Sequence, residues 1–193
     1  MRFHYLLCST LVLLSLFCLL PAAHADSWLP PKPSATYESA AGDARFTVTT
    51  SGRIDSLVAC RGTLLAKSDN NQWRQLWDKP LQNPLSPVSA VVADGGWRVI
   101  TFDNYYSAGY GDEAIVFYSE TGDLIRKYSL EVLLSKEELD RVPRSVSSRW
   151  WRGRIRLDEA LGILTVDVVQ SSADKRSLKS ISFNLADGRV LSP

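Results

Sequence analysis

Residues 112–128 read DEAIVFYSETGDLIRKY and contain the pattern that decides the fold. An apolar run from Ala114 to Tyr118 is followed by a polar turn at 120–123 and by a second run that ends at Tyr128. Two short runs of this kind, joined by a turn that contains Gly and Asp, are typical of a β-hairpin. The stretch therefore predicts two antiparallel strands.

The same pattern recurs along the chain. Paired runs are expected at 64–67 and 73–77, 88–93 and 97–102, 155–157 and 162–169, and 181–185 and 190–191, with a single run at 45–50. Grouped by their spacing, these runs predict an all-β domain over 37–193, built from antiparallel four-strand meanders at 37–82, 88–130 and 149–193.

The run from Asp112 to Tyr118, continuing through Gly122 to Tyr128, resembles the blade repeats of β-propeller proteins. This resemblance is generic, because the chain has no Trp-Asp closing dipeptide. It implies about three blade-like repeats, whereas propellers usually have four to eight. The repeats would then form an open stack or share a ring with a second chain, so a homo-oligomer is one alternative. A plain antiparallel sandwich is another.

One helical insertion is expected between the second and third meanders. Ser135 and Glu138 have the spacing of a capping box at a helix start. Leu139 and Val142 follow on the same short helix, and Pro143 ends it. This helix is expected to cover a sheet edge or an open end of the core.

The N-terminus is predicted to be a cleaved secretory signal over 1–25. Arg2 precedes an apolar run over 6–20, and Ala23 and Ala25 have the small side chains of a cleavage site. A Pro-rich leader over 26–36 follows. The protein is therefore expected to be exported, either periplasmic or secreted, and its mature part is not expected to span a membrane.

Removal of the signal restricts the chemistry of the mature chain. Both histidines, His4 and His24, are lost, which excludes Ser-His and Cys-His nucleophiles and His-containing metal sites. Cys60 is left without an internal disulfide partner and is expected to be a buried thiol. Loss of Arg2 reduces 22 basic residues to 21, equal to the 21 acidic residues, so nucleic acid is not an expected partner. We expect no metal and no cofactor.

The first candidate binding segment is basic and aromatic. If 150–157 is a strand, alternation places Trp150, Arg152, Arg154 and Arg156 on one face. Guanidinium groups suit carboxylate or phosphate ligands, so an anionic glycan or an envelope protein is a candidate partner. The alternative is a solvated strand face whose arginines pair with neighbouring acids.

The second candidate is the loop over 103–113. Its tyrosines, Tyr105, Tyr106 and Tyr110, offer flat contact surfaces with hydroxyl groups, which suit sugar or protein recognition. Asp103 and Asp112 are the one carboxylate pair that could act together in glycoside hydrolysis. We therefore expect a non-catalytic binding or assembly module of the cell envelope. A carboxylate-dependent hydrolase of envelope glycans is the alternative, and no catalytic residue is assigned.

Overall fold

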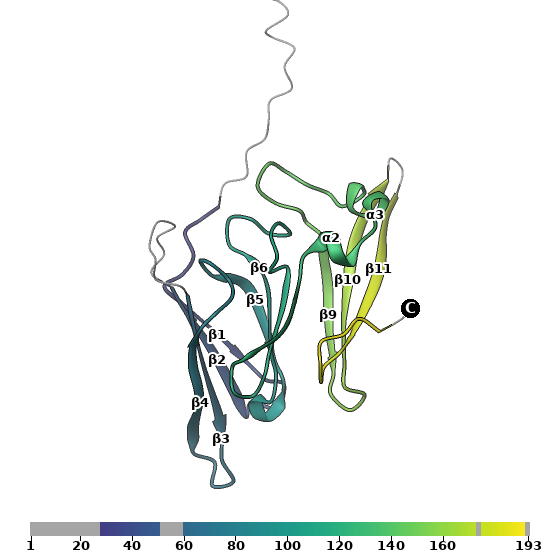
Figure 1. Cartoon of the computed structure of the whole chain (residues 1–193). Coiled ribbons are helices and arrows are strands. Elements are labelled where there is room, and N and C mark those ends of the chain that lie inside the picture. The colour runs from purple at the N-terminus through teal and green to yellow at the C-terminus, as the bar shows by residue number, and fades with distance from the viewer. Residues whose placement is uncertain (1–27, 51–59, 173–174, 192–193) are drawn as a thin grey trace, which may run out of the picture.

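The computed structural model describes residues 28–50, 60–172 and 175–191, so the predicted signal over 1–25 lies outside the described residues. This part of the chain contains eleven strands in three antiparallel sheets and two short α-helices (Figure 1). The predicted all-β class is confirmed.

Each sheet is formed by strands that are consecutive in the sequence. The first sheet contains β1 (Ser34–Glu38), β2 (Ala44–Thr49), β3 (Arg61–Lys67) and β4 (Trp73–Pro80). The second contains β5 (Pro87–Val92), β6 (Val99–Asn104), β7 (Ile115–Tyr118) and β8 (Leu124–Tyr128), with a 3-10 turn, η1 (Asp94–Gly96), between β5 and β6. The third contains β9 (Arg152–Asp158), β10 (Ile163–Ser172) and β11 (Lys175–Asn184).

Two of the three predicted four-strand meanders are present, and the third has three strands. The predicted turn at Asp187 and Gly188 forms, but the segment that returns from it makes only a single bridge, between Val190 and Phe183. The first strand begins at Ser34, inside the predicted leader, because residues 34–38 pair with residues 45–49 of β2.

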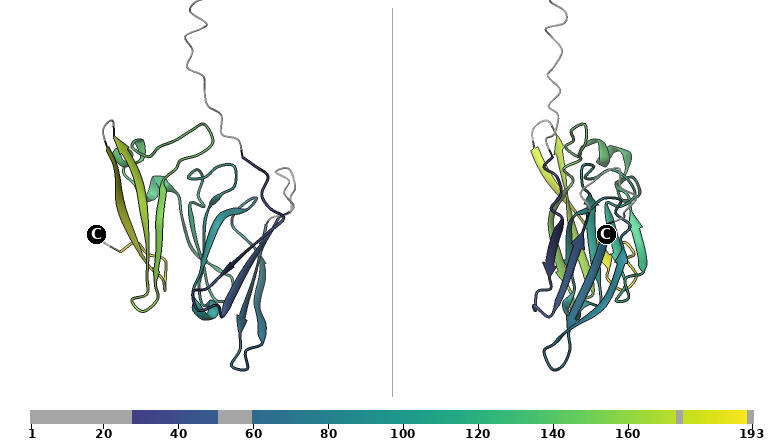
Figure 2. Two further views of the ribbon diagram at one scale, coloured as in Figure 1. Left: turned by 180° about the vertical axis from the view of Figure 1, so that it is seen from behind. Right: turned by 90° about the vertical axis from the view of Figure 1, so that its left-hand side faces the viewer.

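The second sheet lies between the other two, and both of its faces are buried (Figures 1 and 2). On β6, Val99 belongs to the core shared with the first sheet, and Ile100 and Phe102 belong to the core shared with the third. A strand buried on both faces has continuous apolar sequence, which explains the run over 99–102. Ring contacts cross each interface, from Trp77 to Tyr118 and from Phe117 to Phe183.

The helical insertion consists of α2 (Leu130–Leu133) and α3 (Lys136–Asp140). The predicted capping box is confirmed, because Ser135 and Glu138 exchange both of its hydrogen bonds. Leu130, Leu134 and Val142 close the core between the second and third sheets. No helix in the described chain is long and apolar enough to cross a membrane.

The outward faces of the first and third sheets are polar. On the first sheet, Glu38 pairs with Arg45 and Arg61 pairs with Asp78. On the third sheet, the Asp167 carboxylate accepts two hydrogen bonds from Arg156 and one from Ser180. The apolar faces are therefore turned toward the second sheet, and the polar faces are turned toward solvent.

Candidate binding pocket

A pocket of about 230 Å³ forms where the loop after β6 meets the segment before β9. Its wall is formed by Ser148–Arg152 together with Trp28, Val88, Asp103 and Ala108. The two segments are joined by a backbone hydrogen bond of 2.8 Å from Arg149 N to Ala108 O. The structure therefore brings together the two segments that the sequence analysis proposed separately. We call this site the aromatic pocket, because three of its wall residues are tryptophans.

The carboxylate of Asp103 lies at the buried end of the aromatic pocket. Asp103 is the fifth residue of β6, but its φ of 59° is left-handed. Alternation along β6 is broken as a result: Asp103 lies on the same side as Phe102, toward Trp151, while Asn104 lies on the Thr101 side with Asn83. Asp and Asn tolerate this backbone conformation better than most residues.

Neutral N–H donors and one cation surround the Asp103 carboxylate. Its Oδ1 accepts hydrogen bonds from Trp151 Nε1 at 2.7 Å and from Gly109 N at 2.9 Å. Its Oδ2 lies 3.6 Å from Arg152 Nε. Burial raises the pKa of Asp103, and the Arg152 charge and the two donors oppose this rise. Burial likewise lowers the pKa of Arg152, against the opposing effect of Asp103.

Arg152 is on the pocket side because β9 contains a bulge. Ile155 pairs with Val166, but Arg152 pairs with Val168, so β9 has one residue more than β10 between these two pairs. A β-bulge of this kind bends the strand and re-aims a side chain beside it. The Arg152 guanidinium therefore lies 5.0 Å from the centre of the Phe102 ring. The predicted row of three arginines on one face is wrong for this reason.

The other two arginines of the row are on the polar outer side of the third sheet. Arg156 is paired with Asp167, as the alternative interpretation of this strand expected. Arg154 is exposed. Neither of them lines the aromatic pocket.

Arg149 forms another part of the pocket wall. Its guanidinium pairs with Glu131 and lies 4.3 Å from the centre of the Tyr110 ring. Its Nε is buried and has no hydrogen-bond partner in the described part of the chain. An added Cβ on Gly109 would lie 2.9 Å from the Arg149 carbonyl oxygen, so only glycine fits this close approach between the segments.

One exposed indole and one half-buried indole belong to the pocket wall. Trp150 is 53% exposed. Trp28 packs at 5.0 Å from Tyr105 and 6.0 Å from Tyr106, and its Nε1 donates to Ser147 Oγ at 3.3 Å. Tyr105 and Tyr106 thus hold Trp28 in place without lining the pocket.

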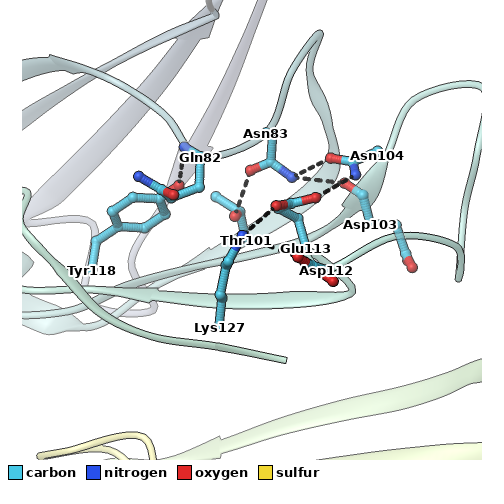
Figure 3. Close-up of polar contacts among 9 residues, drawn as sticks. All are labelled: Gln82, Asn83, Thr101, Asp103, Asn104, Asp112, Glu113, Tyr118 and Lys127. Atoms are coloured by element: carbon cyan, nitrogen blue, oxygen red, sulfur yellow. Dashed lines mark hydrogen bonds and ion pairs between the residues drawn. The ribbon is translucent and has the colours of Figure 1, made fainter. Parts of the chain in front are cut away.

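A buried polar network supports the pocket from the side of the first sheet (Figure 3). Asn83 donates to the Asp103 carbonyl oxygen and to Asn104 Oδ1, and accepts from Thr101 Oγ1. Asn104 in turn donates to Glu113 Oε2 at 3.1 Å. These contacts fix the backbone of the β6 end on both sides of the left-handed residue.

Outside the pocket, the remaining sequence-predicted residues have structural contacts. Asp112 pairs with Lys127 at 3.6 Å and does not line the pocket, so the proposed pair of Asp103 and Asp112 does not share a cavity. Tyr110 donates to the Ser145 carbonyl oxygen at 3.4 Å. Among the described residues, no cluster of three or more His, Cys, Asp or Glu side chains is placed to hold a metal ion.

Three residues predicted from the sequence line the pocket: Asp103, Trp150 and Arg152. Trp28, Arg149 and Trp151 line it as well and are not among the predicted residues. The uninterrupted run of basic and aromatic residues over 149–152 was a usable signal for Arg149 and Trp151. Consecutive residues beside a pocket can all contribute to its wall, as these four do. Trp28 had no such signal, since its partners are more than 70 residues away.

Neither the comparison with protein-family models nor the comparison with curated proteins gives a match to this chain.

Proposed function

We propose that the mature chain is an exported, non-catalytic binding module of the cell envelope, and that it holds an uncharged sugar ring or glycan end in the aromatic pocket. The observation that supports this proposal is the composition of the pocket wall. It combines indole planes with a few polar groups whose hydrogen bonds hold them in fixed positions. Ligand sites typically combine an apolar lining with a few such polar groups.

The charges of the pocket favour a neutral ligand over the anionic glycan expected from the basic sequence. Arg152 faces Asp103, and Arg149 is paired with Glu131. Each guanidinium that lines the pocket therefore has its own carboxylate. What remains for a ligand is the exposed plane of Trp150.

Sugar rings present an apolar C–H face and a rim of hydroxyl groups, which match an indole plane and fixed polar groups respectively. The pocket volume of about 230 Å³ is below the roughly 300–1,000 Å³ of typical small-molecule sites. This size supports recognition of one ring or a chain end.

The test is a titration of the mature protein with neutral oligosaccharides of N-acetylglucosamine, followed by tryptophan fluorescence. Trp150→Ala is expected to weaken binding about tenfold or more, because it removes the exposed indole plane on which the sugar ring would pack. Trp73→Ala is the matched control, since Trp73 is also exposed but lies under Arg45 on the first sheet.

Equal affinities for Trp150→Ala and the wild type would refute the pocket as the site. Binding of polygalacturonate in place of the neutral oligosaccharides, with strong salt dependence, would restore the anionic ligand and overturn the neutral one.

A further inference from the structure

A second pocket lies at the end of β6 opposite to the aromatic pocket. Trp97, which lines it, comes just before the first residue of β6, whereas Asp103 of the aromatic pocket comes near the last. Its volume of about 360 Å³ falls within the roughly 300–1,000 Å³ of typical small-molecule sites. We call this site the inter-sheet pocket, because β3 and β4 of the first sheet form one wall, and η1, Trp97 and the β7–β8 turn form the other.

Two polar links join the walls of the inter-sheet pocket. Gly95, which lines it, donates its N–H to Asp43 Oδ1 at 2.9 Å. Lys79 of β4 pairs with Asp123 of the β7–β8 turn, with Nζ and Oδ1 2.6 Å apart. The space is therefore spanned by contacts between the two sheets that form it.

The lining between the walls is apolar. Leu76 is the extra residue of the β4 bulge, and its side chain packs toward the core between the first and second sheets. Ala66 beside it is buried and small. The Trp97 ring is held in place because its Nε1 donates to Glu159 Oε2 at 3.1 Å. These side chains offer a surface against which an aliphatic or aromatic group can pack.

Opposite charges face each other across this lining. Arg74 pairs with Ala66 in the β3–β4 ladder, so its side chain lies on the inner side of the first sheet. Glu120 is in the β7–β8 turn on the other wall. Within the described part of the chain, neither of them has an ion-pair partner within 4 Å, and neither has Lys67, which also lines the pocket.

One further cation acts on Glu120 from outside the lining. Burial lowers the pKa of Arg98, and the charge of Glu120 opposes this fall. The Arg98 guanidinium, however, donates to the carbonyl oxygens of Leu185, Ala186 and Trp97. Its donors are therefore used by the backbone, and the Glu120 carboxylate faces the pocket.

We infer that the inter-sheet pocket binds a small zwitterion, an α-amino acid with an apolar side chain. The carboxylate of the ligand meets Arg74, whose planar guanidinium suits carboxylates bidentately, with Lys67 as a second positive charge. Its ammonium group meets Glu120, and its side chain packs against Leu76 and Trp97. A ligand with only one of the two charges would face an unmatched charge on the opposite wall, which discriminates against it.

The experiment is isothermal titration calorimetry of the mature chain with L-leucine and with L-phenylalanine. Saturable binding of at least one is expected. N-acetyl-L-leucine lacks the ammonium group and L-leucinamide lacks the carboxylate, and each is expected to bind about tenfold or more weakly than L-leucine. The same comparison is made with the derivatives of L-phenylalanine.

Arg74→Gln and Glu120→Gln are each expected to weaken amino-acid binding about tenfold or more. Both side chains are exposed and unpaired in the described chain, so both variants are expected to fold. Arg154→Gln is the matched control, since Arg154 is also exposed but lies outside the pocket. Glu120→Gln is expected to leave the weak binding of N-acetyl-L-leucine unchanged, because that ligand has no ammonium group.

Absence of saturable binding for both amino acids would overturn the inference. Equal binding of L-leucine and N-acetyl-L-leucine would overturn it too, since the site would then recognise an anion alone. Unchanged affinity in both Arg74→Gln and Glu120→Gln would place the amino acid elsewhere. Trp150→Ala is expected to leave amino-acid binding unchanged, and Arg74→Gln to leave oligosaccharide binding unchanged, so failures of the two pockets are distinguishable.

Discussion

The Asp103 carboxylate joins the strand core to the pocket wall at the scale of single residues. It accepts hydrogen bonds from Trp151 and Gly109 and lies beside the buried guanidinium of Arg152. Loss of the carboxylate would therefore leave both a buried indole N–H and a buried cation without their partner. The residue has two roles: it stabilises the fold at the end of β6, and it fixes the geometry of the pocket.

Asp103→Ala is expected to lower the free energy of unfolding by about 3–5 kcal/mol, the range for removal of one partner of a buried ion pair. Asp103→Asn is expected to cost less, because Asn tolerates the left-handed backbone and its amide oxygen can still accept from Trp151. Urea denaturation of the two variants measures the difference. Similar losses for both would show that the charge of Asp103, and not its backbone, accounts for its role.

The pair of Asp167 and Arg156 predicts a loss of stability in acid. Hydrogen bonds from Arg156 and Ser180 lower the pKa of Asp167 to about 2 from an ordinary value of 3.8. A lowered folded-state pKa means that the stabilisation is complete above the unfolded pKa and is lost as the pH falls from about 4 through about 2. Between pH 7 and pH 2, Asp167→Asn is expected to lose less stability than the wild type. Parallel losses in guanidinium titrations at the two pH values would contradict this prediction.

The loop after β6 is the element that decides whether the pocket exists. Tyr106 and Gly109 of this loop have positive φ, and so does Asp103 at the end of β6; Asp103 and Tyr106 are not glycine. Left-handed non-glycine residues persist where surrounding contacts hold them, and they cluster at functional sites. At the same end of the molecule, the bulge in β9 turns Arg152 toward this loop. The pocket is therefore the product of two local irregularities in otherwise regular strands.

Gly109→Ala is expected to destabilise the protein more than Gly42→Ala. Both glycines have similar left-handed φ values, 73° and 69°, so both variants incur the backbone cost of about 1–2 kcal/mol. An alanine Cβ at 109 would also meet the Arg149 Cβ at 2.7 Å, while at 42 it would meet no atom within 4 Å. The additional cost at 109 is about 1–3 kcal/mol, as for overpacking.

Chemical denaturation measures both glycine variants, and the oligosaccharide titration measures the pocket. Equal destabilisation of the two variants would show that the loop moves away from Arg149 at little cost. In that case the close approach of the two segments would not define the pocket.

The whole molecule is a stack of three sheets whose two outer faces are polar. The outer face of the first sheet has two ion pairs, Arg45 with Glu38 and Arg61 with Asp78. On the outer face of the third sheet, the Asp167 carboxylate accepts hydrogen bonds from Arg156 and Ser180. A further blade or sheet would have to bury these charged groups, which costs free energy unless each group is paired again. The stack has no apolar face left for ring closure among the described residues.

The mature chain is therefore expected to be a monomer at high concentration. Multi-angle light scattering measures its mass, which is expected to be that of one chain. A stable dimer would contradict the prediction and would reopen the alternative in which two chains complete one assembly.

Most of the strand positions could be predicted from the sequence, because short apolar runs bounded by Gly, Asp and Asn are a local signal. The hairpin of β7 and β8 and the capping box at Ser135 are both present where the sequence placed them. The site was predicted in part: Trp150, Arg152 and Asp103 line one pocket. The arginine row was wrong, because a single extra residue in β9 interrupts the alternation between Arg152 and Ile155, and alternation cannot foresee such a residue.

The sequence alone determined the β-rich class and most of the strand positions, because each of these depends on nearby residues. Only the tertiary structure decided that the loop after β6 meets the segment before β9 and that Trp28 reaches Tyr105. These features depend on how segments distant in sequence pack together. They also depend on the left-handed backbone of Asp103 and on the β9 bulge, which direct side chains into the pocket only when the neighbouring strands are in place.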